Sequence, residues 1–86
     1  MSNNICFKFL GNMARNLGYR VCIDIEQCIS IEEALYRALN RYGVSIQVED
    51  LAYIFKDSVV NRDDNVCNYL GEEISVVRVV QGGVFM

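Results

Sequence analysis

The chain has 86 residues, of which 52% are apolar and 22% charged, and its net charge of −3 accompanies a pI near 4.7. This length supports one domain with one hydrophobic core. The eight Lys and Arg residues are scattered, there is no histidine, and no apolar run approaches the roughly 20 residues that span a bilayer. We therefore expect no nucleic-acid partner, no membrane partner and no self-sufficient hydrolase.

The first two elements are predicted to be strands joined by a long loop. Residues 5–10 carry apolar side chains at every second position, which is the period of a strand with one buried face. Residues 11–18 begin and end with glycine and are expected to form a loop. Residues 20–26 alternate again, with valine and isoleucine on one side and charges on the other. Together these segments predict a β-hairpin.

A helix is predicted over residues 31–42. Ser30 and Glu33 have the spacing of a capping box, in which each side chain bonds the backbone N–H of the other residue. The apolar residues that follow recur at helical spacing and form one stripe, which includes Leu35 and Leu39. Gly43 is expected to stop the helix.

The second half of the chain is predicted to contain short strands and one long strand. Residues 51–55 and 59–60 favour strands, the polar residues 61–65 favour a loop, and residues 66–70 favour a helical turn. Residues 73–80 predict the last strand, with Ile74 and Val76 facing the core. One helix packed across one small sheet is an α+β arrangement.

The four cysteines give no metal-site spacing, and no histidine can complete a zinc site. The simplest interpretation is that they are free thiols inside a reducing cytosol. The alternative is a cross-strand disulfide between Cys6 and Cys22, which would suit an intracellular protein of a hyperthermophile. The N-terminus shows no basic region ahead of an apolar run, so no signal peptide is expected and the predicted location is the cytoplasm.

The closing segment ends in an unusual way. Gly82 and Gly83 are adjacent, and only Val84, Phe85 and Met86 follow them. Two glycines have no side chains to pack and lose much backbone entropy on folding, so they suit a slender tip better than a strand. We expect a folded domain over residues 1–81 and a flexible tail over residues 82–86.

Residues 71–83 resemble the closing segment of the MoaD/ThiS sulfur carriers, which belong to the ubiquitin-like β-grasp superfamily. In that family a Gly-Asp-Glu-Val-like turn opens the last strand, and Gly-Gly ends the chain at the same separation. Residues 7–18 and 30–35 resemble the opening strand and the helix start of the family. The resemblance implies a mixed sheet of four to five strands with one main helix packed across one face.

The resemblance also implies the chemistry. The Gly83 carboxylate would be adenylated by an E1-like activating enzyme and then converted to a thiocarboxylate, which donates sulfur for molybdopterin or for another thiolated cofactor or tRNA. This chain is expected to bind no cofactor and no metal, because ATP and Mg belong to the E1-like partner. The large subunit of molybdopterin synthase is a further implied partner. Gly82, Gln81, Val79 and Val77 are the expected binding residues of the tail and the partner-docking strand.

The chain departs from the family because Val84, Phe85 and Met86 follow the second glycine. While Val84 is attached, Gly83 has no free carboxylate, so a processing protease is expected to remove the three residues. For Val77 and Val79 a second interpretation stays open, which is packing within the sheet. Two other function classes also stay open: a ubiquitin-like modifier joined through Gly83 to lysines, and a β-grasp interaction subunit that has lost the activation chemistry.

Overall fold

The computed structural model of the chain describes residues 3–10, 20–43, 50–80 and 84–85. Its elements in chain order are β1 (Asn4–Phe9), β2 (Arg20–Asp24), α2 (Ile31–Arg41), β3 (Leu51–Phe55), β4 (Ser58–Val60), the 3-10 helix η1 (Val66–Tyr69), β5 (Glu73–Val80) and β6 (Val84–Phe85). The strands, the helix and the helical turn predicted from the sequence are confirmed, with ends that shift by one or two residues. The predicted loop at residues 11–18 and the connection at residues 44–49 lie outside the described residues.

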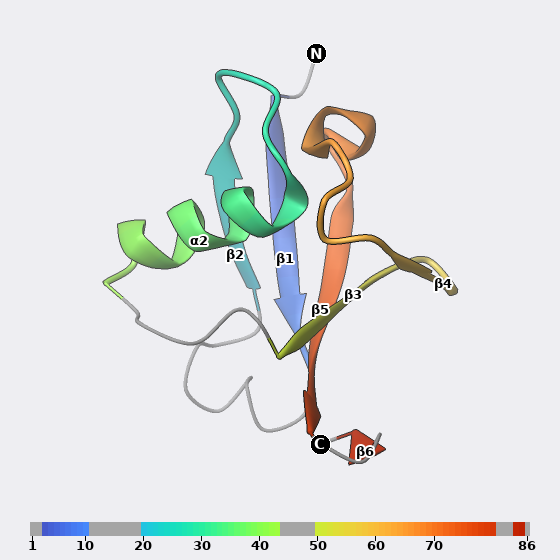
Figure 1. The fold of residues 1–86 in the computed structure, drawn as a ribbon. Coiled ribbons are helices and arrows are strands. Elements are labelled where there is room, and N and C mark those ends of the chain that lie inside the picture. Colours follow the sequence, from blue (N-terminus) through green and yellow to red (C-terminus); the bar gives the residue numbers. More distant parts are fainter. Residues whose placement is uncertain (1–2, 11–19, 44–49, 81–83, 86) are drawn as a thin grey trace.

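The strands form a mixed sheet in the order β2-β1-β5-β3-β4, and β6 pairs with β5 off this path (Figure 1). β1 and β5 are parallel neighbours at the centre, while β2 is antiparallel to β1 and β3 is antiparallel to both β5 and β4. The parallel register sets Phe7 opposite Ile74. The expected α+β class with a mixed sheet is therefore confirmed.

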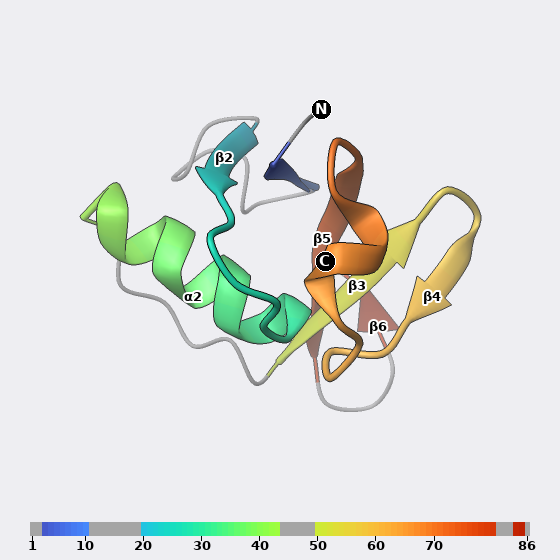
Figure 2. The same ribbon diagram turned by 90° about the horizontal axis from the view of Figure 1, so that it is seen from above.

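The hydrophobic core lies between the sheet and α2, which crosses one face of it (Figure 2). The helix contributes its apolar stripe, in which Leu35 is 0% and Leu39 2% exposed. The sheet contributes the inward residues of its central strands, among them Phe7 and Ile74, and both are fully buried. Among the described residues, no helix has the length and apolar character that a membrane crossing needs.

One half of the predicted capping box is present at the start of α2. The Glu33 N–H donates to the Ser30 hydroxyl oxygen at 3.1 Å, which satisfies one of the free amides of the first turn. The Glu33 carboxylate instead pairs with Arg37 one turn later, also at 3.1 Å. At the other end Gly43 has a φ of 73°, a conformation that glycine adopts without strain.

The interpretation of the cysteines as free thiols is wrong, because all four are paired. Cys6 faces Cys22 across the β1–β2 ladder, and their Cα atoms are 4.0 Å apart in a disulfide. Both therefore lie on the face of the sheet away from α2, since the alternate residues of β1 enter the core. The cross-strand alternative was correct.

A second disulfide, between Cys28 and Cys67, had no signal in the sequence. It ties the segment before α2 to η1, with Cα atoms 5.4 Å apart. The neighbouring Val66 N–H donates to the Ile29 carbonyl at 2.8 Å, so the backbone already brings the two cysteines together. The cysteines are 39 positions apart, and only the folded chain makes them neighbours.

Leu35→Ala is expected to lower the free energy of unfolding by about 2 to 5 kcal/mol, because it leaves a cavity in a fully buried site. Urea denaturation followed by circular dichroism measures the loss. Tyr36→Ala is the matched control, since the neighbouring Tyr36 side chain is half exposed, and it should change stability by less than about 0.5 kcal/mol. Equal effects of the two variants would contradict the placement of the helix.

The two disulfides are expected to contribute unequally to stability. Loop closure predicts a loss of about 4 kcal/mol for the double variant Cys28→Ala, Cys67→Ala and about 3 kcal/mol for Cys6→Ala, Cys22→Ala. The difference follows from sequence separations of 39 and 16 residues. Thermal unfolding with and without a reductant measures both. An unfolding midpoint that does not respond to reductant in the wild-type chain would show that the thiols are free.

Candidate functional site

The C-terminal end of β5 is the first candidate site, because it leads directly to Gly82 and Gly83. β1 accompanies β5 as far as Val76, and β3 accompanies it as far as Arg78. Among the described residues, β5 therefore continues for two residues beyond its last pairs with β1 and β3. Figure 1 shows β5 in the middle of the sheet, and in the sequence Gln81 separates its last residue, Val80, from Gly82 and Gly83.

Only part of the predicted site can be placed. Val77 lies opposite Ala52 on the face away from α2 and is 7% exposed, which favours sheet packing over docking at this position. Val79 belongs to β5, but its side chain is not among those described. The predicted residues 81–83 and Met86 lie outside the described residues. The division into residues 1–81 and 82–86 stays a prediction.

The segment after the glycines has a backbone partner that the sequence analysis did not foresee. Val84 pairs with Val80 and Phe85 with Val79, in an antiparallel ladder between β6 and β5. The sequence carried a weak signal for this pairing, because valine and phenylalanine favour strands and glycines favour a turn between two strands.

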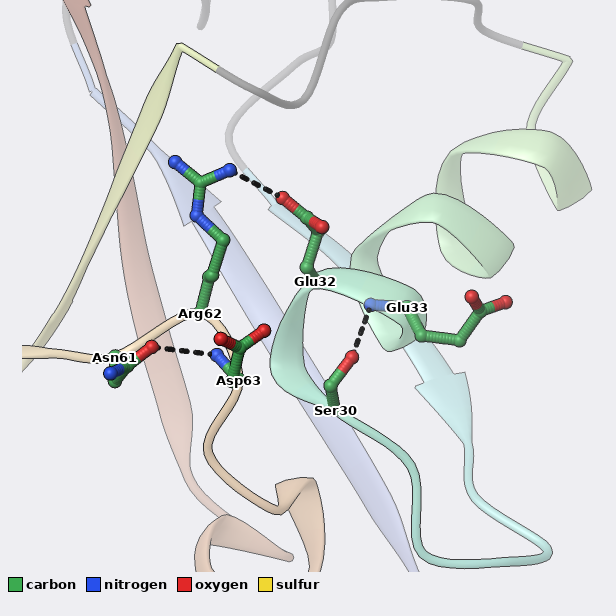
Figure 3. Close-up of polar contacts among 6 residues, drawn as sticks. All are labelled: Ser30, Glu32, Glu33, Asn61, Arg62 and Asp63. Carbon is green, nitrogen blue, oxygen red and sulfur yellow. Dashed lines mark hydrogen bonds and ion pairs between the residues drawn. The ribbon is translucent and has the colours of Figure 1, made fainter.

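The second candidate site is the N-terminus of α2, where residues 61–66 lie against the first helical turn. The Ile31 N–H donates to the Asp64 carbonyl at 2.9 Å, and the Glu32 N–H donates to the Arg62 carbonyl at 3.1 Å. An ion pair of 3.1 Å joins the Glu32 carboxylate to the Arg62 guanidinium (Figure 3). These bonds use amides that a helix N-terminus would otherwise offer to an anion.

Polar residues of this loop stabilise its conformation through local hydrogen bonds. The Asn61 side-chain oxygen accepts from the Asp63 N–H at 2.9 Å (Figure 3), and the Asn65 side-chain oxygen accepts from the Cys67 N–H at 2.9 Å. The Tyr69 hydroxyl donates to the Asp64 carboxylate at 3.3 Å. Burial and the Asp64 carboxylate raise the pKa of Tyr69. The arrangement is that of a structural turn.

Tyr53 is the unusual residue in this region. Its side chain is 1% exposed, and its hydroxyl is a buried polar group without a hydrogen-bond partner among the described residues. Burial raises the pKa of Tyr53, the Glu32 carboxylate raises it further, and Arg62 opposes the shift. A phenol with a raised pKa stays protonated near neutral pH, so it is not suited there to act as a general base.

A shallow hollow of about 270 Å³ lies beside the helix start. Its lining consists of Ser30, Glu32, Glu33 and Tyr36. Both glutamates are already engaged, one by Arg62 and the other by Arg37. The hollow therefore offers no unpaired charge from these side chains.

Metal binding finds no support in the described residues, where no group of three or more Cys, Asp or Glu side chains could hold an ion. The cysteines are the softest ligands of the chain, and each is in a disulfide. A disulfide sulfur offers no thiolate to a metal.

No protein-family model matches the chain, and no curated protein sequence matches it. Solved structures with a similar fold include the UBL domain of Plasmodium falciparum Dsk2, with 23% identity and a TM-score of 0.57 over 91% of this chain and 99% of that one. SAMP1 from Haloferax volcanii gives 14% identity and a TM-score of 0.58 over 93% and 99%. The designed protein dRafX6 gives 16% identity and a TM-score of 0.65 over 91% and 98%. The chain has the ubiquitin-like β-grasp fold.

Tyr53→Phe is expected to stabilise the protein by about 1 kcal/mol, because it removes a buried hydroxyl that has no partner. Tyr69→Phe is the matched control and should be destabilising, since it removes the bond to Asp64. The Tyr53 pKa is raised in the folded state, so the unfolded chain ionises first and stability falls as pH rises through 10.0. That alkaline loss should be smaller in Tyr53→Phe. Urea titrations at pH 7 and pH 11 measure both effects, and a destabilised Tyr53→Phe would contradict the unpaired hydroxyl.

Proposed function

We propose that this β-grasp domain is a sulfur carrier whose own C-terminus, processed to Gly83, is the reacting group. The observation that carries the proposal is the course of β5. In the described part of the chain, this central strand extends two residues beyond its pairs with β1 and β3, and Gln81, Gly82 and Gly83 follow it in the sequence. A rigid domain with a side-chain-free thread at one end suits delivery of a carboxylate into a narrow active site of another protein.

The proposed reaction needs little from the carrier beyond that thread. The Gly83 carboxylate attacks the α-phosphate of ATP on an E1-like enzyme, and pyrophosphate leaves. The terminal sulfur of an enzyme persulfide then attacks the acyl carbon, and AMP leaves. A thiol reductant cleaves the resulting acyl disulfide and releases the thiocarboxylate. The partner supplies the ATP site and Mg, and the sulfur passes to molybdopterin or to another thiolated cofactor or tRNA.

The partners follow from this chemistry. They are an E1-like activating enzyme, a protease that removes residues 84–86, and a sulfur-accepting enzyme such as the large subunit of molybdopterin synthase. The proposed location is the cytoplasm. Two disulfides are unusual there in mesophiles but occur in the intracellular proteins of hyperthermophiles, so the protein of such an organism would satisfy both conditions.

Two alternatives share the fold. A ubiquitin-like modifier, conjugated through Gly83 to lysines, needs the same processed terminus and the same activating step. An interaction subunit without activation chemistry is favoured by one observation, which is that β6 pairs with β5 in the chain that still carries Val84 and Phe85. The products separate these classes: a thiocarboxylate, an isopeptide bond or neither.

A chain that ends at Gly83 is expected to form an adenylate with an E1-like enzyme and ATP, whereas the full-length chain should not, because its Gly83 carbonyl is an amide. ATP–pyrophosphate exchange measures the step, and the intact mass reports the thiocarboxylate as a gain of about 16 Da, the difference between sulfur and oxygen. The control is a chain that ends at Gly82, which keeps the domain but lacks the reacting residue. Equal activation of the full-length chain and the Gly83 chain would contradict the requirement for processing.

A further inference from the structure

The end of β5 is the place where the chain makes a contact that the proposed function does not use. Among the described residues, the pairs of β5 with β1 end at Val76 and its pairs with β3 end at Arg78. Beyond them, β6 pairs with β5 through Val79–Phe85 and Val80–Val84. A strand from the chain itself thus occupies one edge at the end of β5.

We propose that β6 is an inhibitory strand that keeps the end of β5 closed to the activating partner until it is displaced or removed. This inference rests on the proposed function and adds regulation to it. Residues 84–86 then do more than block the carboxylate, because they also occupy the backbone edge at which the partner would approach the tail.

Geometry is the first argument. An antiparallel pair between Val80 and Val84 means that the chain reverses direction between these two residues. A thread that enters a narrow active site must instead continue in one direction away from β5. The paired form and the inserted form exclude each other, so activation requires the β5–β6 ladder to open.

The exposed edge is the second argument. Once β6 is gone, the N–H and C=O groups on one side of Val79 and Val80 lose their partners. Such an edge accepts an extended segment of another protein by strand addition, with main-chain hydrogen bonds supplying the affinity. The partner that fits is therefore an extended peptide segment beside the tail-binding channel of the activating enzyme.

The β5–β6 ladder is weak enough to open and close reversibly. This ladder has two residue pairs, whereas the other ladders of the sheet have three to five, and isolated hairpins of this kind are marginal in water. It can therefore open without unfolding the domain, whose core lies between α2 and the five-stranded part of the sheet.

Amide hydrogen exchange by NMR tests the contact in the full-length chain and in the chain that ends at Gly83. We expect at least one of the Val79 and Val80 amides to exchange about three- to tenfold faster after truncation, because it loses one backbone hydrogen bond. The Arg78 amide is the internal reference, since Arg78 is opposite Leu51 of β3 and should be unaffected. Unchanged exchange at both valines would overturn the proposal.

Binding to the activating enzyme without ATP tests the inhibition. The double variant Val84→Pro, Phe85→Pro removes both N–H groups of β6, while Met86→Pro changes the residue beyond the ladder and is the matched control. All three full-length chains lack a free Gly83 carboxylate, so only the ladder differs. We expect the double variant to bind several-fold more tightly than wild type and Met86→Pro to bind as wild type does.

The outcomes separate the two ideas. Equal affinities for wild type and the double variant, with binding by the chain that ends at Gly83, would overturn the inhibitory strand and leave the sulfur carrier intact. Absence of binding by the Gly83 chain would overturn the proposed function, and the exchange measurement would still decide whether β6 closes the end of β5.

Discussion

The parallel pairing of β1 with β5 is the constraint on which the rest of the structure depends. It joins the first strand of the chain to the long strand β5 and sets Phe7 beside Ile74 and Phe9 beside Val76. Because these residues are buried on one face, they form the surface against which Leu35 and Leu39 pack. The described pairs of β1 with β5 end at Val76 and those of β3 end at Arg78, and Gly82 and Gly83 follow Val80 in the sequence after Gln81. The candidate site is therefore the continuation of the strand that organises the core.

The parts of the fold that depend on neighbouring residues were predictable. Ser30 and Glu33 mark the start of α2 through a local hydrogen bond, and the helical spacing of Leu35 and Leu39 identifies its buried face. Gly71 has a φ of 79°, as a glycine-initiated turn before the last strand requires. Each signal lies within a few residues of the feature that it specifies. The order of these elements was then enough to favour one helix across one sheet.

Two of the missed features depend on the packing of distant segments, and the third is a short local strand pairing. Cys28 and Cys67 meet only because residues 61–66 fold against the start of α2, and no cysteine spacing encodes that approach. The unpaired hydroxyl of Tyr53 follows from burial, which is a property of the packed core. β6 has two residues, which is too short for a strand periodicity in the sequence. Its pairing with Val79 and Val80 is therefore seen only in the structure. For the candidate site, the sequence located the glycines but not the strand that follows them.

The two disulfides bear on the proposed chemistry as well as on stability. An acyl-adenylate at Gly83 is a reactive electrophile, and a free cysteine thiolate on the same chain would be a good nucleophile for it. Attack by such a thiolate would divert the activated carrier into a thioester before persulfide sulfur arrived. In this chain Cys6 is joined to Cys22 and Cys28 to Cys67, so no cysteine has a thiol to offer. If the chain is the sulfur carrier proposed above, its disulfides leave the sulfur of the partner as the acceptor of the acyl group.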